Sequence, residues 1–294
     1  MFKPSILNQS NDIKSCTIIG SGNVATHIAC ALASHISIKQ IYSRDISHAQ
    51  ELVDKIVESE DYQAMFGPSH CGADAVLSSE KPVAYPQAIS NLADLQSGAD
   101  IYIIAVPDDH IAGIIEATSA ITDGIWTHTS GSMPIDLFAG CKMSYGVFYP
   151  LQTFSKNKPL DFTQVPMLIE GSDSDVADAL IGLANKISRD VKKVGSDGRK
   201  QLHIAAVFAC NFVNYLWAQA DEILKDVDLN INVLRPLLTE TLDKLQTLSP
   251  RDAQTGPARR GDVNIINKHL AMLDERKAEI YRFLTDKIID EFKS

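Results

Sequence analysis

The sequence CTIIGSGNVA at Cys16–Ala25 decides the fold class. Its first four residues have the apolar, β-branched character of a buried strand, and a helical pattern begins at Asn23. Between them the chain has the spacing G-x-G-x-x-A, formed by Gly20, Gly22 and Ala25. A strand that enters a helix through such a turn is the opening unit of a doubly wound α/β sheet.

Each position of the turn has a physical reason. Gly20 permits a tight turn, Gly22 lets a pyrophosphate approach the backbone, and Ala25 lets the helix pack closely on the strand. The free N–H groups and the dipole of the helix N-terminus favour an anion. A glycine turn can also be plain punctuation, but here strand, turn and helix agree. We therefore predict that a dinucleotide binds at Gly20, Ser21, Gly22, Asn23, Val24 and Ala25.

Outward from this turn, short apolar runs alternate with helical stretches. The expected strands are Ile38–Tyr42, Ile101–Val106, Ile125–Thr127, Tyr145–Phe148 and Met167–Ile169. After about Gly195 only helical patterns follow, at Asp197–Lys225, Val233–Leu245 and Val263–Phe292, the last one capped by Asp262. We predict a Rossmann-type doubly wound parallel sheet in residues 1–195 and an all-α domain in 196–294, with residues 58–81 as a surface insertion.

Composition limits the classes of partner. The 294 residues are 45% hydrophobic and 22% charged, as in a globular protein, and the net charge is −10. That charge argues against nucleic acid or an anionic membrane as the main partner. We find no apolar run of about 18 residues, no signal-peptide pattern and no metal-ligand spacing of histidines. The five scattered cysteines, most of them in apolar surroundings, lack a CxxC pair, so we expect reduced thiols and a cytoplasmic protein.

The end of the second strand distinguishes between the two nicotinamide dinucleotides. An NAD protein usually has an acidic residue there, about 20 residues past the glycines, to hold the ribose 2′-hydroxyl. This chain has Ser43 and Arg44, and a guanidinium suits a 2′-phosphate. Asp45 would supply the acidic group if the strand were longer, and Arg44 could also be a solvated surface residue. We predict NADP in preference to NAD.

Three further strand ends should line the crevice in which a ligand of such a sheet lies. The residues that we expect to contact the cofactor there are Ala105, Val106, Pro107, His128 and Ser130. Gln152 and Thr153 follow the third strand and are expected to contact the substrate. The run Thr129–Ser132 is also ordinary turn chemistry, so both interpretations remain open.

The long helix predicted from Asp197 is apolar nearly all round, which favours burial in a subunit interface. Its polar residues His203, Asn211 and Asn214 fall on one face at 100° per residue. Such a stripe is either a hydrogen-bonded helix contact or the wall of a substrate cleft. Lys200, on a neighbouring face, could reach a substrate carboxylate.

Several motifs in order carry a resemblance that covers nearly the whole chain. They are the glycine turn, Ala105-Val-Pro-Asp, His128-Thr-Ser-Gly-Ser, Pro150-Leu-Gln-Thr-Phe, the His203…Asn211 helix and Thr255-Gly-Pro…Arg260-Gly-Asp. The chain resembles the NADP oxidoreductases that join a Rossmann-like domain to a helical domain of unknown function. That group is similar to pyrroline-5-carboxylate, ketopantoate and deazaflavin-dependent NADP reductases.

The resemblance implies a phosphate-binding turn, a 2′-phosphate site at Ser43 and Arg44, and a homodimer formed through the helical domain. Hydroxyacid dehydrogenase relatives have a lysine one turn before the asparagine that Asn211 matches. Val207 stands at that position here, which argues against lysine-dependent keto-acid chemistry.

The leading hypothesis is an NADP(H)-dependent oxidoreductase with a small C=O or C=N substrate, or a deazaflavin, in a cleft between the domains. His203 is the expected proton donor, because its ordinary pKa lies near neutrality, and Asn211 is expected to orient the substrate. The alternative is a dinucleotide-binding sensor or scaffold without turnover.

Overall fold

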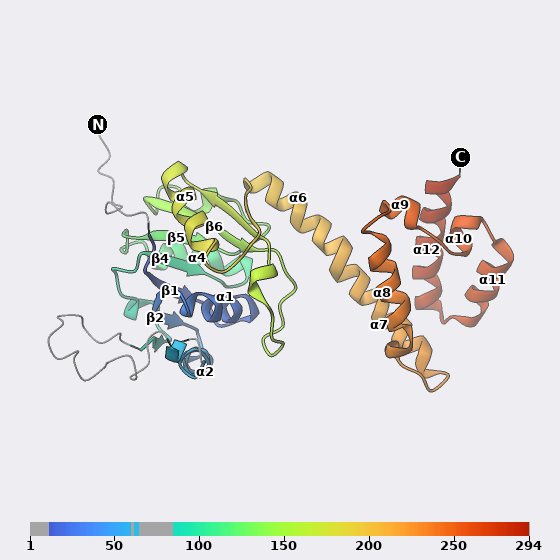
Figure 1. The fold of residues 1–294 in the computed structure, drawn as a ribbon, viewed down its shortest axis with the longest axis horizontal. Helices are drawn as coiled ribbons and strands as arrows, with labels where there is room; N and C mark the ends of the chain where they lie inside the picture. Colours follow the sequence, from blue (N-terminus) through green and yellow to red (C-terminus); the bar gives the residue numbers. More distant parts are fainter. Residues whose placement is uncertain (1–11, 60–61, 65–84, 294) are drawn as a thin grey trace. The chain divides into compact units, whose positions relative to one another are not determined.

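The computed structural model describes residues 12–59, 62–64 and 85–293. Most of the predicted insertion at 58–81 lies outside the described residues. Within them the chain forms an eight-stranded sheet in the order β3-β2-β1-β4-β5-β6-β7-β8 (Figure 1). The strands are β1 Ser15–Ile19, β2 Ser37–Tyr42, β3 Gln87–Ile89, β4 Ile101–Ile104, β5 Ile125–His128, β6 Ser144–Pro150, β7 Met167–Gly171 and β8 Val191–Lys193.

The first six strands are parallel neighbours in the order of a dinucleotide-binding sheet, which confirms the predicted Rossmann-type fold. The sheet is not parallel throughout. β7 pairs antiparallel with β6, and β8 pairs parallel with β7, so the last two strands run against the other six.

Helices cover both faces of the sheet. They are α1 Asn23–Ala33, α2 Ile46–Val57, α4 Asp108–Ala117 and α5 Ser174–Ala184, with short 3₁₀ turns at Leu92–Asp94, Ile135–Phe138 and Phe162–Gln164. After β8 the chain continues in α6 Ser196–Ala206, which leads away from the sheet (Figure 1). Side chains alternate along each strand, so Ile18 packs in a core with α1, α2 and α5. Its neighbour Ile19 packs in a second core with α4. These two cores hold the carboxyl ends of β1 and β4 beside each other.

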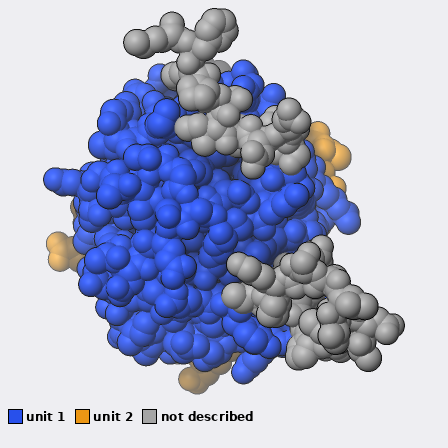
Figure 2. All heavy atoms as spheres, turned by 90° about the vertical axis from the view of Figure 1, so that its left-hand side faces the viewer, with its two compact units in different colours: residues 1–207 blue, residues 208–294 orange. Residues whose placement is uncertain are grey.

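The chain divides into two compact units, residues 1–207 and 208–294, which Figure 2 colours separately. A π-helix at Val207–Phe212 joins α6 to α7. The helices of the second unit are α7 Val213–Lys225, α8 Arg235–Lys244, α9 Pro250–Ala253, α10 Pro257–Arg260, α11 Val263–Met272 and α12 Glu275–Phe292, with a 3₁₀ turn at Ile231–Leu234. As expected, no strand follows β8 among the described residues. The domain boundary proposed at 195/196 stays a prediction.

The prediction of a single helix over Val263–Phe292 is wrong, because the chain forms two helices there, α11 and α12. Leu273 is extended, and Asp274 starts a new helix by accepting a hydrogen bond from the backbone N–H of Lys277. Asp262 caps α11 in the same way, through the N–H of Ile265.

The thiols are less buried than the sequence indicated. Cys16 is buried, but Cys141 and Cys210 are exposed, and the thiols of the described cysteines are unpaired. Among the described helices, none combines the length and the apolar character needed to cross a membrane.

Candidate functional site

The two glycines after β1 meet different demands. Gly20 has a φ of +131°, and a Cβ atom there would lie 2.2 Å from the carbonyl oxygen of Ala105. Gly22 has an ordinary φ of −75°, and a Cβ atom there would meet nothing within 4 Å. The fold therefore requires Gly20. The missing side chain of Gly22 leaves open space in front of α1, as the close approach of a diphosphate to the backbone demands.

The N-terminus of α1 carries no side-chain cap and no acidic residue in its first turn. The first intrahelical hydrogen bond runs from the N–H of Thr26 to the oxygen of Gly22, at 2.9 Å. The side chain of Asn23 binds elsewhere, donating to the oxygen of Phe154 and accepting from the N–H of Lys156. By contrast, Asp45 caps α2. The uncapped N–H groups of α1 fit the diphosphate of a dinucleotide.

A cavity of about 550 Å³ opens beside this turn, between the ends of β2 and β4 and the first turns of α4. Among the residues that line it are eight that the sequence analysis selected: Gly20, Ser21, Gly22, Ser43, Arg44, Ala105, Val106 and Pro107. Asn23, Val24 and Ala25 do not line it, and Ala25 is buried in the core against the sheet.

The far end of the cavity is formed where β2 stops. The strand ends at Tyr42, so Ser43 takes the position at which a ribose-binding acid would stand. Ser43 is buried, and its hydroxyl accepts a hydrogen bond of 2.9 Å from Ser21. Arg44 is exposed at the rim. This end of the cavity thus offers a hydroxyl and a guanidinium.

Asp45 is already engaged. Its carboxylate accepts hydrogen bonds from the backbone N–H of Ser47 at 2.9 Å and from the Ser47 hydroxyl at 2.7 Å. These hydrogen bonds, with the side-chain one the larger cause, hold the pKa of Asp45 below its usual value. Asp45 also lines the cavity, but its Oδ1 is engaged in capping α2.

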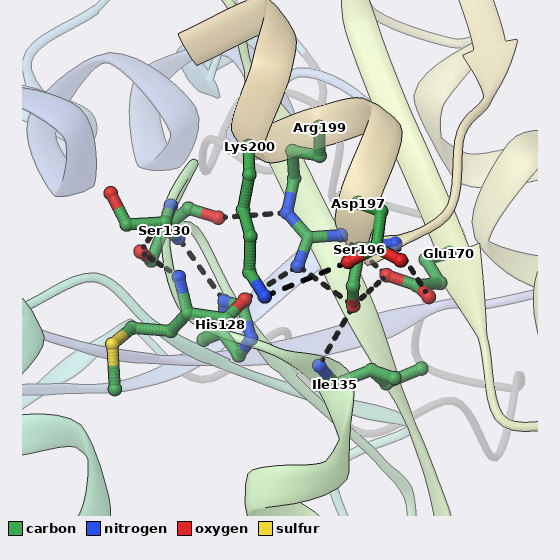
Figure 3. Close-up of polar contacts among 10 residues, drawn as sticks. His128, Ser130, Ile135, Glu170, Ser196, Asp197, Arg199 and Lys200 are labelled. Atoms are coloured by element: carbon green, nitrogen blue, oxygen red, sulfur yellow. Dashed lines mark hydrogen bonds and ion pairs between the residues drawn. The ribbon is translucent and has the colours of Figure 1, made fainter. Parts of the chain in front are cut away.

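A polar cluster around the buried Arg199 lies under the N-terminus of α6 (Figure 3). Arg199 is 0% exposed and pairs with the carboxylate of Glu170. Its Nε donates to the carbonyl of Ser130 at 3.1 Å, and its guanidinium also donates to the carbonyl of Met133. Ser196 completes the cluster by donating its hydroxyl to Glu170 at 2.8 Å. The cluster holds the loop after β5 against α6.

His128 supports the same loop from beneath. Its ring is fully buried, stacks on Phe138, and accepts a hydrogen bond from the backbone N–H of Ser130 through Nδ1, at 3.2 Å. Burial, and next the charge of Arg199, lower the pKa of His128 to about 4. The imidazole is therefore neutral around pH 7.

His203, on α6, lies against the end of β6. Its Nδ1 is 3.0 Å from the hydroxyl of Tyr149, and the two rings meet edge to face with centroids 6.1 Å apart. Gly131 fits closely beneath them. A Cβ atom there would lie 2.7 Å from Nδ1 of His203 and 2.9 Å from Cζ of Tyr149. The pair therefore depends on the absence of a side chain at Gly131.

With this geometry in view, the relatives of the chain are informative. A crystal structure of a "putative NADP oxidoreductase" from Bacteroides fragilis is 35% identical, with a TM-score of 0.80. The match covers 95% of this chain and 99% of that protein. This chain belongs to the same family.

Other comparisons agree on the fold of this NADP oxidoreductase family. A family model described as a domain of unknown function (DUF2520) matches residues 165–288. Protein TM1727 from Thermotoga maritima is 20% identical with a TM-score of 0.62, covering 95% of this chain and 96% of that one. A reductive aminase from Aspergillus terreus in complex with NADPH is 14% identical with a TM-score of 0.63, covering 95% and 94%. Among curated proteins nothing matches.

The remaining residues selected from the sequence are more dispersed. Gln152 and Thr153 are exposed after β6, where Oε1 of the Gln152 side chain accepts a hydrogen bond from the backbone N–H of Thr153. Asn211 lies in the π-helix and Asn214 in α7, both in the second unit. A π-helix turns less per residue than the 100° assumed for the polar stripe, so the stripe stays a prediction.

Sequence reasoning missed four polar side chains of the first unit. Tyr149, Arg199, Glu170 and Ser196 were not selected as site residues. One signal was present, because Arg199 stands four residues before His203 and therefore on the same face of α6.

Lys200 forms an exposed ion pair with Asp197 at 3.8 Å. Among the described residues no His, Cys, Asp and Glu cluster could hold a metal ion.

Proposed function

We propose that this protein is an NADP(H)-dependent oxidoreductase that transfers a hydride to or from a small C=O or C=N substrate. The observation that carries the proposal is the cavity beside Gly22, whose far end offers Ser43 and Arg44 while Asp45 is engaged in capping α2. Membership of a family named for NADP oxidoreduction supports the cofactor class. The complex of the similarly folded reductive aminase with NADPH is consistent with it.

The chain's own residues would divide the binding of the cofactor. The backbone at Gly20–Gly22 and the N-terminus of α1 would hold the diphosphate. Ser43 and Arg44 would hold the 2′-phosphate, because a guanidinium offers two parallel hydrogen bonds to phosphate oxygens. Ala105, Val106 and Pro107 would pack along the dinucleotide at the exit of β4.

When bound, the nicotinamide supplies or accepts the hydride. In the reductive direction His203 donates a proton to the substrate oxygen or nitrogen, and in the oxidative direction it takes that proton back. Asn211 orients the substrate, while Gln152, Thr153 and Asn214 contribute further contacts. The neutral His128 does not act as an acid, since its buried ring has given up its charge.

We propose further that the protein is a homodimer assembled through its helical unit. Large apolar side chains are exposed on this unit in the single chain, among them Phe208 at 65%, Leu237 at 62% and Leu242 at 61%. Exposed apolar side chains in such number are typical of an interface. Light scattering after size-exclusion chromatography should give twice the mass of the 32.2 kDa chain.

The first experiment is a titration of the purified protein with NADPH and with NADH, followed by nicotinamide fluorescence. The proposal requires NADPH to bind at least tenfold more tightly than NADH. Equal or reversed affinity would overturn the 2′-phosphate site and would instead assign Asp45 to the ribose 2′-hydroxyl. Failure of both to bind would overturn the cofactor assignment.

The second experiment tests turnover. NADPH oxidation is measured with a panel of small ketones and aldehydes, with and without an amine, and with a deazaflavin as the alternative hydride acceptor. His203→Gln should abolish turnover and leave NADPH affinity within twofold. A wild-type protein that binds NADPH but oxidises it with none of these acceptors would favour a sensor or scaffold.

A further inference from the structure

We propose that Tyr149 holds His203 through Nδ1, so that Nε2 is the nitrogen that exchanges a proton with the substrate. This inference rests on the proposed function. It concerns a residue on β6 that touches His203 and makes Tyr149 a positioning residue for the reaction.

The two ring nitrogens of His203 differ in their hydrogen-bond partners. Nδ1 of His203 lies 3.0 Å from the Tyr149 hydroxyl. Among the described residues nothing forms a hydrogen bond with Nε2, and the His203 side chain is partly exposed. A group hydrogen-bonded to one ring nitrogen fixes the ring orientation and the tautomer, and thereby selects the nitrogen that does the chemistry.

Tyr149 and His203 are packed closely between rigid elements. Gly131 closes one side, because a Cβ atom there would lie 2.7 Å and 2.8 Å from two atoms of the His203 ring. One turn earlier on α6, Arg199 fastens the helix to the loop that contains Gly131 through the carbonyl of Ser130. Tyr149 itself is only 9% exposed. Such packing on rigid elements limits the rotation of the imidazole.

The hydrogen bond between the Tyr149 hydroxyl and Nδ1 of His203 has a defined direction in the reacting state. Two charged groups act on Tyr149: the guanidinium of Arg199 on α6 and the carboxylate of Asp108 at the start of α4. Burial is the main cause that raises the pKa of Tyr149, so it remains a neutral phenol. Protonated His203 carries a hydrogen on each ring nitrogen, so its Nδ1–H donates and the lone pairs of the Tyr149 hydroxyl oxygen accept.

The proton balance follows from this arrangement. Protonated His203 donates Nδ1–H to Tyr149 and gives up its Nε2 proton as the hydride reaches the substrate carbon. The C=O or C=N double bond becomes a single bond, and the oxygen or nitrogen takes that proton. His203 is left neutral, with Nδ1–H still donated to Tyr149. Oxidation runs the same steps in reverse.

The test is ¹⁵N NMR of histidine-labelled full-length protein without added ligand, with His203 assigned from the spectrum of His203→Gln. In its neutral form, wild-type His203 should show a protonated Nδ1 and a bare Nε2. In Tyr149→Phe, which keeps the ring packing, the tautomer should shift toward Nε2–H. Tyr145→Phe on the same strand is the matched control and should leave His203 unchanged.

Two NMR outcomes overturn the inference: a wild-type His203 that carries its proton on Nε2, or His203 nitrogen shifts that Tyr149→Phe does not alter. Gly131→Ala gives a second approach, since its added carbon must displace the imidazole, and it should also shift the His203 resonances.

Kinetics separates this inference from the proposed function. With an acceptor found in the panel, Tyr149→Phe should lower kcat about 10-fold to 100-fold and change the pH profile, with NADPH affinity unchanged. Full activity in Tyr149→Phe, together with an inactive His203→Gln, overturns the inference and leaves the proposed function intact. If the wild type turns over nothing, the proposed function fails, and the NMR result then decides only whether Tyr149 sets the His203 tautomer.

Discussion

The cavity beside the glycine turn is lined by residues that follow the ends of β1, β2 and β4 and by residues of α2 and α4, whereas the polar cluster around the buried Arg199 joins side chains from distant segments. The cavity needs open space and uncapped N–H groups, which cost the fold little. The cluster needs every partner, because a buried polar group without one is costly. Changes at the cavity should therefore appear in ligand affinity, and changes in the cluster should appear in stability.

The largest effect is expected from Arg199→Met. It leaves the carboxylate of Glu170 without its ionic partner and the carbonyl of Ser130 without a donor, so the free energy of unfolding should fall by about 3–5 kcal/mol. Urea unfolding measures it. The matched control is Lys186→Met, which breaks the exposed pair with Asp12 and should cost less than about 1 kcal/mol.

A double variant sharpens the same point. Adding Glu170→Gln to Arg199→Met removes the stranded charge and should recover part of the lost stability. A loss under about 1 kcal/mol in the single variant would mean that the cluster is no more demanding than the cavity, and the contrast would be gone.

The second effect depends on pH and comes from His128. Its folded pKa of about 4 lies below the ordinary 6.5, so the unfolded chain binds a proton first as the pH falls. The stability that neutral His128 contributes is complete above pH 6.5 and is lost progressively down to pH 4. The loss amounts to about 3 kcal/mol. His128→Asn should flatten the fall of Tm over this window, while His35→Asn, at an exposed position, should not. An unchanged slope in His128→Asn would contradict the low pKa.

At the cavity, Gly22→Val should fold as the wild type does, since a Cβ atom at Gly22 meets nothing within 4 Å. Its side chain would occupy the space that a diphosphate needs, so NADPH affinity should fall about 100-fold, or about 2.7 kcal/mol. The control is Gly182→Ala on α5, which also has open space and should leave affinity unchanged. A melting temperature that falls by more than a few degrees in Gly22→Val would show that this position also serves the fold.

The same contrast explains which parts were predictable from the sequence. The unit β1–turn–α1 is local, so its strand, glycines and helix follow from about twenty consecutive residues, and the structure begins α1 at Asn23 as predicted. The reversal of β7 is not local. The run from Met167 has the apolar character of any buried strand, and nothing in its composition states the direction in which it pairs.

The site shows the same division. Residues of the cavity could be named because they follow the ends of strands in a known order. Tyr149 and His203 are 54 residues apart, and Arg199 and Glu170 are 29 apart, so their contacts depend on how β6, β7 and α6 pack.

The break between α11 and α12 was missed because the apolar period continues through Leu273. A single cap at Asp274 interrupts the helix there.

The smallest effect concerns Arg44, at the rim of the cavity. Because its side chain is exposed, Arg44→Ala should leave the melting temperature unchanged. It removes one cation beside the expected 2′-phosphate, so NADPH affinity should fall about tenfold, or about 1.4 kcal/mol, while NADH affinity stays the same. Arg189→Ala, an exposed arginine outside the cavity, is the control and should change neither. Fluorescence titration with both dinucleotides measures the ratio. If NADPH and NADH weakened together, Arg44 would bind a part of the dinucleotide that both share, and selectivity would have to come from Ser43 or His48 in the same cavity.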